Sequence, residues 1–277
     1  MYTYELDYYC NRYGYWKIRI FSILTSIKQS NGVVLLGVFM ASYKGKRVVI
    51  TGGTRGIGYQ LARKYFDLGA EVIITGTKEV YLGDDSFKYI KLKCNDRKSI
   101  DEFINYLSLY GHIDIFINNA GINIINHVDD INISDFDDVI DINLKAPFIL
   151  SKLVACNYMK EGDKILNIAS IWSVITRRGR VSYISSKNGL VGLTKGLATD
   201  LAEKGILVNS ISPGFVKTEL TFNSLSKEEI EELENKIPLG RLAEPIEIAN
   251  VAAFITSDEN SYITGQNIVV DGGFCNV

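Results

Sequence analysis

A glycine-rich segment, placed between an apolar run and a helical pattern, constrains the fold of this chain most. It reads Thr51-Gly52-Gly53-Thr54-Arg55-Gly56-Ile57-Gly58, after the apolar run 47–50 and before residues 59–66, whose apolar positions recur at helical spacing. Glycine accepts positive φ and lets a ligand approach the main chain closely. A strand, a tight turn and a helix N-terminus with free N–H groups favour phosphate binding. With a second apolar run at 71–75, the pattern predicts a dinucleotide-binding unit.

The chain beyond this segment alternates between short apolar runs and longer helical patterns. Further strands are expected at 87–92, 113–118, 164–169, 207–212 and 268–270, and helices at 99–110, 134–160, 183–204 and 245–255. Apolar strands that alternate with helices indicate a parallel sheet buried on both faces. We therefore expect an α/β fold: a Rossmann-type doubly wound parallel sheet of about seven strands, with helices on both faces, in a single domain.

Three polar side chains downstream have the chemistry of a proton relay. Tyr183 and Lys187 are four residues apart in a helical pattern, so they lie on one face, one turn apart. A free tyrosine titrates near pH ~10, and a neighbouring cation favours its phenolate. Ser170, thirteen positions before Tyr183, offers a hydroxyl that can hold a carbonyl while the phenol protonates it. Taken alone, the Tyr-Lys pair also fits a solvated helix face.

Together these segments resemble the single-domain short-chain dehydrogenase/reductases over residues 45–274, most of the chain. The glycine spacing Thr-Gly-x-x-x-Gly-x-Gly is typical of that family. Four further segments match it in order: Asn118-Asn119-Ala120-Gly121, Asp141-Ile142-Asn143-Leu144, Pro213-Gly214-Phe215-Val216-Lys217-Thr218 and Val270-Asp271-Gly272-Gly273. Within the family, the nearest general resemblance is to 3-oxoacyl-carrier-protein reductases.

The resemblance implies hydride transfer between a nicotinamide ring and a substrate carbon, with no metal. Tyr183 is then the general acid in reduction and the base in oxidation, while Lys187 lowers its pKa and binds the nicotinamide ribose. Ser170 orients the carbonyl, and Asn143 holds a helix kink and anchors the proton relay. The expected cofactor contacts are Thr51, Gly52, Thr54, Arg55, Gly56, Ile57, Gly58, Thr77, Lys78, Asn118, Ala120, Gly121, Tyr183, Lys187, Pro213, Gly214, Val216 and Thr218.

The choice between NAD(H) and NADP(H) depends on the end of the second strand, where an acidic side chain would bind the ribose 2′-hydroxyl. Gly76 occupies that position. Arg55 and Lys78 can pair with a 2′-phosphate and Thr77 can donate to it, so we expect NADP(H) in preference to NAD(H). The alternative is that Arg55 is a solvated loop cation.

One position departs from the family pattern. Many relatives carry an aspartate that contacts adenine after the third strand, and Lys93 or Cys94 occupies that position here. The sequence therefore leaves the adenine contact unassigned.

Composition excludes several classes of function. With 277 residues, 47% of them hydrophobic, and a formal net charge of −2, the chain can bury a full core and has no overall bias toward nucleic acids or membranes. Its four cysteines include no Cys-x-x-Cys pair, which disfavours a disulfide framework or zinc site and favours a cytoplasmic location. His112 and His127 lie in no ligand-like cluster, so we expect structural or surface roles for both and no metal site.

Residues 214–244 are the segment that the family pattern constrains least. Ser226-Lys227-Glu228-Glu229 is a capping box at the start of an acidic helix. We interpret the segment as a lid over the substrate, and a solvated surface helix is the alternative. The expected substrate contacts of the lid are Leu220, Phe222, Leu225 and Leu233.

Three arginines, Arg177, Arg178 and Arg180, lie between Ser170 and Tyr183. Guanidinium groups near an active site can recognise a carboxylate, a phosphate or an acidic carrier protein. A solvated or subunit-interface loop is the alternative.

Residues 1–39 match nothing in the family. Their apolar runs, 18–27 and 33–40, are each too short to span a bilayer. We interpret residues 1–39 as an extension, either upstream of a translation start at Met40 or a disordered arm, and residues 40–277 as the catalytic domain. A weak membrane anchor is the remaining alternative.

The sequence thus predicts an NADP(H)-dependent oxidoreductase that interconverts a carbonyl and a secondary alcohol, with 3-oxoacyl-thioester reduction as the first candidate. The alternatives are a sugar or polyol dehydrogenase of carbohydrate or surface-polysaccharide metabolism, and a non-catalytic nucleotide-binding scaffold, which would need no proton relay. The expected partners are a small-molecule substrate and further copies of the chain in a dimer or tetramer, with 134–160 and 183–204 at the interface. Neither nucleic acid nor membrane is expected as a partner.

Overall fold

The computed structural model describes residues 9–10, 16–17, 42–222 and 226–276. The chain divides into two units, Met1–Met40 and Ala41–Val277. In the first unit, β1 (Tyr9–Cys10) pairs antiparallel with β2 (Trp16–Lys17). The other predictions for residues 1–39, and the predicted lid contact Leu225, lie outside the described residues.

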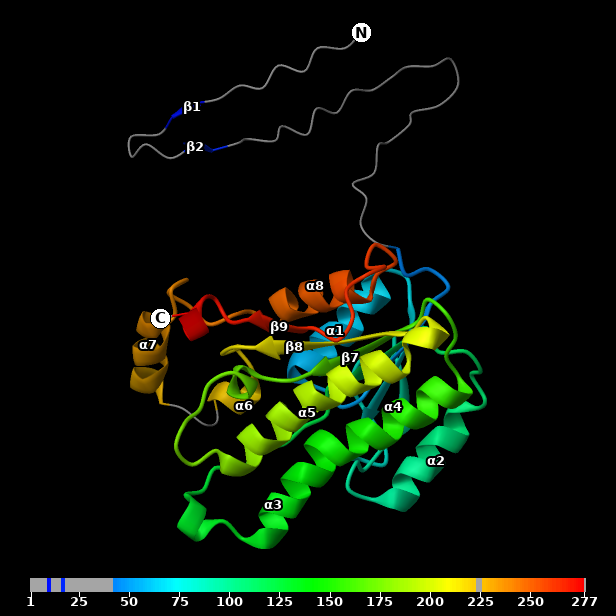
Figure 1. The fold of residues 1–277 in the computed structure, drawn as a ribbon, viewed down its shortest axis with the longest axis horizontal. Coiled ribbons are helices and arrows are strands. Elements are labelled where there is room, and N and C mark those ends of the chain that lie inside the picture. The colour runs from blue at the N-terminus through cyan, green and yellow to red at the C-terminus, as the bar shows by residue number, and fades with distance from the viewer. Residues whose placement is uncertain (1–8, 11–15, 18–41, 223–225, 277) are drawn as a thin grey trace. The chain divides into compact units, whose positions relative to one another are not determined.

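Seven parallel strands form the sheet of the second unit, in the order β5-β4-β3-β6-β7-β8-β9 (Figure 1). They are β3 (Arg47–Ile50), β4 (Glu71–Gly76), β5 (Lys88–Lys91), β6 (Ile115–Asn118), β7 (Lys164–Ile168), β8 (Leu207–Pro213) and β9 (Asn267–Val270). Val48 of β3 lies opposite Val72 on one side and Ile115 on the other. Strand order reverses between β3 and β6, where open α/β sheets bind ligands. The predicted Rossmann-type fold is confirmed.

Alternate side chains of each strand pack against opposite helix layers. Val48 and Ile50 pack with α1 (Gly56–Asp67) and α8 (Pro245–Thr256), whereas Val49 packs with α2 (Arg97–Leu107), α4 (Ala146–Asn157) and α5 (Val181–Asp200). Figure 1 shows these two layers on either side of the sheet. Strands buried on both faces need apolar residues at successive positions, which is the pattern that the sequence shows.

The predicted helix 134–160 is interrupted. α3 (Ile133–Ile140) continues into a π-helical turn (Asp141–Lys145) before α4 begins. The Asn143 side chain in this turn bonds the main chain of Ile122, a contact that a regular periodicity does not reveal. The predicted helix 183–204 is α5 followed by a 3-10 turn at Ala202–Lys204, and α2 begins two residues before its predicted start because Asp96 caps it. Other 3-10 turns are Val128–Asp130, Ile171–Ser173 and Phe274–Asn276.

The segment 214–244 contains α6 (Glu219–Phe222) and α7 (Lys227–Lys236). Its two ends are tied together, because Lys217 N donates to Ala243 O (2.9 Å) and Lys217 Nζ pairs with Glu244 (2.7 Å). The predicted capping box is present at the start of α7. Across the described ranges, no helix is both long and apolar enough to cross a membrane.

Candidate active site

The glycine loop is held against the end of β6 by Asn119. Its Nδ2 donates to Thr51 O (3.0 Å) and Gly52 O (2.9 Å), while Thr51 Oγ1 accepts from the main-chain N of Asn119 and of Ala120 (both 3.0 Å). A Cβ atom on Gly58 would lie 2.2 Å from Gly52 O. The family motif contains Asn119, but its place in the sequence predicted no role for its side chain. The structure shows that it braces the loop that a dinucleotide would contact.

The segment after β8 faces the glycine loop. Gly56 has a φ of +55°, and a Cβ atom placed on it would lie 3.6 Å from Thr218 Cγ2. Gly214 packs so closely on Asp271 that a Cβ atom would lie 2.7 Å from its Cα. Glycine is therefore needed at residue 214 for close packing, and at residue 56 for a positive φ beside Thr218. This cradle, with a helix N-terminus at its base, fits a dinucleotide pyrophosphate.

The predicted proton-relay residues are brought together at the carboxyl ends of β6 and β7. Lys187 Nζ donates to Ile168 O (2.8 Å), at the end of β7, and lies 5.5 Å from the centre of the Tyr183 ring. A Cβ atom on Gly121 would lie 3.6 Å from Lys187 Nζ and 3.2 Å from Asn143 Oδ1. Gly121 therefore leaves room between the lysine and the asparagine.

Asn143 is fully buried and makes three hydrogen bonds. Its Oδ1 accepts from Ile122 N (2.9 Å), and its Nδ2 donates to Ile122 O (2.8 Å) and Ser186 Oγ (3.1 Å). The Ser186 hydroxyl in turn donates to Tyr183 O (2.8 Å). The sequence analysis missed Ser186, although its place three residues after Tyr183 on the same helix was a usable signal.

Burial dominates the electrostatics of Tyr183 and Lys187. It raises the pKa of Tyr183, while a hydrogen bond from Ser170 and the charge of Arg180 act to lower that pKa. Burial lowers the pKa of Lys187 from 10.5 to about 8. The resemblance implied that Lys187 lowers the pKa of Tyr183. That role of Lys187 stays a prediction, and in the structure Ser170 and Arg180 also act to lower this pKa.

Ser170 follows β7 and is 8% exposed. Its Oγ accepts from Trp172 N (3.3 Å). The Trp172 ring contacts Phe215 edge-on, with centroids 6.1 Å apart, and Phe215 contacts Phe274 in the same way at 5.0 Å. This aromatic row packs the serine loop against the segment after β8.

The position that selects between NAD(H) and NADP(H) carries no carboxylate. Gly76 ends β4, and a Cβ atom there would lie 2.8 Å from Thr54 Cγ2. Lys78 is exposed just beyond the strand. Arg55 is also exposed and forms a 3.7 Å ion pair with Glu219 at the start of α6. Both cations are thus accessible to a phosphate, although the structure also gives Arg55 a protein partner.

The side chains of several predicted cofactor contacts pack into the protein. The Asn118 side chain donates into the sheet, to Ser151 Oγ and Asn167 Oδ1 (both 2.8 Å). Ile57 packs on the core, and Val216 is 4% exposed.

At the unassigned adenine position, Lys93 is exposed and burial raises the pKa of Cys94 to about 12. Pro213 is buried at the end of β8, and Thr77 is exposed beside Lys78.

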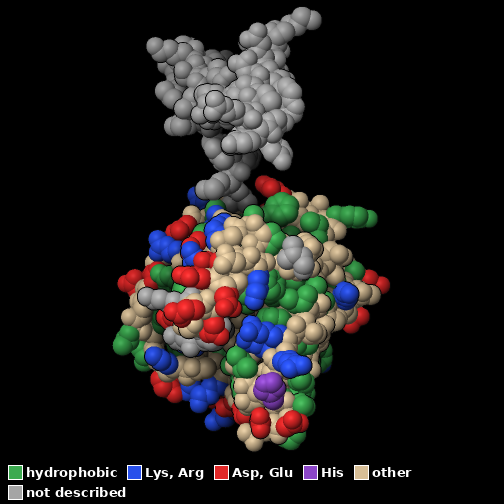
Figure 2. Space-filling model, turned by 90° about the vertical axis from the view of Figure 1, so that its left-hand side faces the viewer, with side chains coloured by type: hydrophobic (Ala, Val, Ile, Leu, Met, Phe, Trp, Pro, Cys, Tyr) green, Lys and Arg blue, Asp and Glu red, His purple; other side chains and the backbone are tan. Residues whose placement is uncertain are grey.

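Acidic side chains are concentrated in segment 214–244, which we interpret from the sequence as a lid. Figure 2 views the side on which α7 lies in Figure 1, and it shows acidic side chains gathered beside basic ones. On α7 the acidic residues are Glu228, Glu229, Glu231, Glu232 and Glu234. Leu233 of the same helix is buried, whereas Phe222 is 53% exposed.

A cavity of about 830 Å³ lies between the end of α7 and the C-terminal turn, lined by Ile175, Ile237, Pro238 and Phe274 among others.

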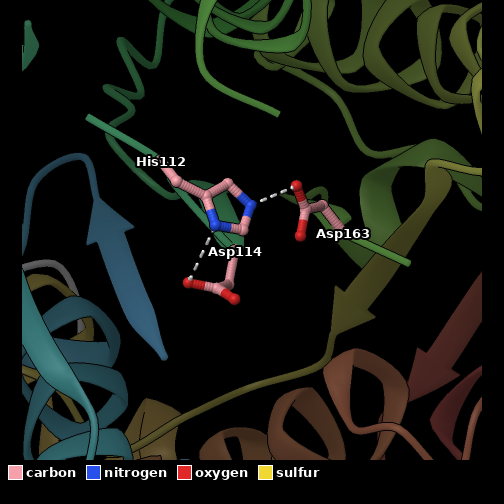
Figure 3. Close-up of side chains that lie close together, drawn as sticks. All are labelled: His112, Asp114 and Asp163. Atoms are coloured by element: carbon pink, nitrogen blue, oxygen red, sulfur yellow. Dashed lines mark hydrogen bonds and ion pairs between the residues drawn. The ribbon is translucent and has the colours of Figure 1, made fainter. Parts of the chain in front are cut away.

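The prediction that His112 lies in no ligand-like cluster is wrong, because His112 lies close to Asp114 and Asp163 (Figure 3). Its Nε2 is 2.8 Å from Asp163 Oδ2, which also accepts from Lys160 N (2.6 Å). Asp114 Oδ2 accepts from Arg47 N (2.8 Å). These oxygens are already used by protein donors, so the cluster ties the loops before β6 and β7 to β3.

Comparison with known proteins agrees with this geometry. A family model described as enoyl-(acyl carrier protein) reductase matches residues 52–275. A 3-oxoacyl-(acyl-carrier-protein) reductase of Rickettsia bellii is 40% identical over 238 residues, which cover 84% of this chain and 98% of the relative.

Two solved structures are similar over most of their length. A putative NAD(P)-dependent gluconate 5-dehydrogenase of Beutenbergia cavernae with bound NADP has a TM-score of 0.78 and 30% identity, covering 85% of this chain and 99% of that one. A 4-hydroxyisoleucine dehydrogenase complexed with NADH has a TM-score of 0.79 and 32% identity, covering 84% of this chain and all of that one. The chain belongs to the short-chain dehydrogenase/reductase family and is an oxidoreductase that uses NAD(P)(H).

Proposed function

We propose that this enzyme reduces the 3-keto group of a 3-oxoacyl thioester with NADPH, with Tyr183 as the proton donor. The observation that carries the proposal is that Lys187 lies beside both the Tyr183 ring and Asn143, while Ser170 acts to lower the pKa of the Tyr183 phenol. The thioester is chosen because relatives such as the Rickettsia bellii enzyme are 3-oxoacyl-(acyl-carrier-protein) reductases. A scaffold that only binds nucleotide would not need this set of residues.

In the proposed mechanism the substrate oxygen lies between the hydroxyls of Ser170 and Tyr183. The nicotinamide ring, when bound, supplies the hydride. Ser170 holds the carbonyl oxygen, and Tyr183 transfers its phenolic proton to that oxygen as charge develops there. Asn143 and Ser186 fix the helix that carries Tyr183, so the phenol is already in place before the reaction begins.

The cofactor preference rests on the end of β4. An acid at this position would repel a 2′-phosphate, and Gly76 offers none. Lys78 is exposed two residues after Gly76, with Thr77 between them. Arg55 is exposed next to Thr54, whose Cγ2 would lie 2.8 Å from a Cβ atom on Gly76. Their donors support NADPH over NADH, because guanidinium and ammonium groups form strong charge-assisted bonds to phosphate.

The test is cofactor oxidation by purified protein with NADPH and NADH in parallel. The substrates are an acetoacetyl thioester, a panel of keto-sugars and a set of small ketones. Turnover of the thioester with NADPH supports the proposal. Turnover of keto-sugars alone would replace it with a polyol dehydrogenase, and tight cofactor binding without turnover of any substrate would support a scaffold.

We also infer that the enzyme acts in the cytoplasm as a homo-oligomer that contacts its copies through α4 and α5. Phe148 of α4 is 46% exposed, and a large apolar side chain at the surface of a long helix favours a contact of this kind. Sedimentation of the purified protein gives the number of subunits, and a monomer would contradict the inference.

A further inference from the structure

Arg180 is placed beside the proton relay. It occupies the N-cap position of α5, without a side-chain capping bond, three residues before Tyr183. Its guanidinium carbon lies 5.7 Å from the centroid of the Trp172 ring, a geometry that holds the cation over an aromatic face. Trp172 is only 7% exposed and is itself packed on Phe215. The aromatic surface under Arg180 is therefore rigid and follows Ser170 by two residues.

Arg180 is half-buried and has no anionic partner among the residues that the structure describes. Five other arginines in the described ranges have one. These pairs are Arg47 with Glu71, Arg55 with Glu219, Arg63 with Asp67, Arg97 with Asp101, and Arg241 with Glu247. A cation that loses water without gaining an anion is costly, and proteins retain such groups where a ligand completes the pair.

The electrostatics of Arg180 agree with this geometry. Burial lowers the pKa of its guanidinium below the ordinary value, and the charge of Arg177 acts in the same direction. The group that favours its charged form is the phenol of Tyr183. Arg177 and Arg178 differ from Arg180 because both are exposed to solvent. The three arginines of this loop are therefore not equivalent.

We propose that Arg180 binds an anionic group of the substrate, a carboxylate or a phosphate, while the substrate carbonyl lies between Ser170 and Tyr183. The proposal rests on the proposed function, because it needs a substrate at that position. A guanidinium suits both anions, since it donates two parallel hydrogen bonds to either. Arg180 would then determine which carbonyl compounds the enzyme accepts.

The test compares substrates that share a reacting ketone but differ in charge. Acetoacetyl-CoA is paired with acetoacetyl-N-acetylcysteamine, which lacks phosphates, and acetoacetate is paired with its methyl ester. Arg180→Gln should lower kcat/KM by about tenfold or more for the charged member of one pair and by much less for its neutral partner. A selective loss of kcat/KM for acetoacetyl-CoA identifies a phosphate as the anion. A selective loss of kcat/KM for acetoacetate identifies a carboxylate. Arg178→Gln is the matched control and should leave both pairs unchanged.

An equal loss on charged and neutral substrates would overturn the proposal, because Arg180 would then act on Tyr183 or on the fold. An unchanged kcat/KM for every substrate would overturn it as well.

If the wild-type protein reduces none of these compounds, the proposed function fails, and a binding experiment then tests Arg180. Acetoacetate and CoA are then titrated into the NADP-bound protein while tryptophan fluorescence, to which Trp172 contributes, is followed. A binding signal that Arg180→Gln abolishes supports the anion site, and a signal that persists contradicts it.

Discussion

Lys187 Nζ lies 5.5 Å from the centre of the Tyr183 ring and donates a 2.8 Å hydrogen bond to the carbonyl of Ile168. The bond ties α5 to the end of β7 and sets the position of the lysine beneath the phenol. Because Lys187 is 4% exposed, its ammonium has exchanged most of its water for one carbonyl. Burial at this position therefore raises the free energy of the charged form of Lys187.

The free-energy cost of burying the Lys187 ammonium predicts how the contribution of this residue to stability depends on pH. Burial lowers the pKa of Lys187 to about 8 in the folded protein, against 10.5 for the ordinary side chain. At this residue the folded state therefore holds fewer protons than the unfolded state between these values, so the contribution of Lys187 to stability rises with pH across this window and is lost as pH falls through about 8.

Lys187→Met removes the titration. The free energy of unfolding of the wild type, measured relative to this variant by urea denaturation, should increase by up to about 3 kcal/mol between pH 7 and pH 10.5. Other groups titrate alike in both proteins and cancel in the difference. A difference that stays constant with pH would show that Lys187 keeps an ordinary pKa.

Gly76→Asp should reverse the cofactor preference. The new carboxylate at the end of β4 would repel a 2′-phosphate, so the ratio of kcat/KM for NADPH to that for NADH should fall by at least about tenfold. Gly76→Ala is the control, because its Cβ also meets Thr54 Cγ2 at 2.8 Å but adds no charge. The alanine variant should weaken both cofactors alike. An unchanged ratio in the aspartate variant would mean that the 2′ position lies elsewhere.

Asn143→Ala should destabilise the fold as well as impair turnover. It leaves both the N–H and the C=O of Ile122 without their side-chain partner, and such groups cost about 1–3 kcal/mol each when buried. We expect a loss of about 2–4 kcal/mol in the free energy of unfolding. Asn157→Ala, at an exposed site on α4, should change it by less than about 0.5 kcal/mol. Equal stabilities of the two variants would refute the structural role of Asn143.

The sequence predicted the sheet and the relay because both follow local rules. Apolar runs define β3 and β4, and the four-residue spacing of Tyr183 and Lys187 places them on one face of α5. The π-helical turn around Asn143 depends on Ile122, which is distant in the sequence and adjacent only after folding. The hydrogen bonds of Asn119 to the glycine loop, and the lack of an anionic partner for Arg180 among the described residues, also depend on tertiary structure. Each of these three features is a tertiary contact, or the lack of one, and periodicity carries no signal for it.

The central claim is that Tyr183 donates the proton in an NADPH-dependent carbonyl reduction. The most direct measurement is NADPH oxidation with an acetoacetyl thioester by the wild type and by Tyr183→Phe, together with the dissociation constant of NADPH for each protein. We predict turnover by the wild type, a kcat that is about 10²–10⁴-fold lower in the variant, and nearly unchanged NADPH binding. Tyr106→Phe, at a side chain that is 48% exposed, should behave as the wild type. Comparable turnover by Tyr183→Phe, or a loss of NADPH binding equal to the loss of rate, would contradict the claim.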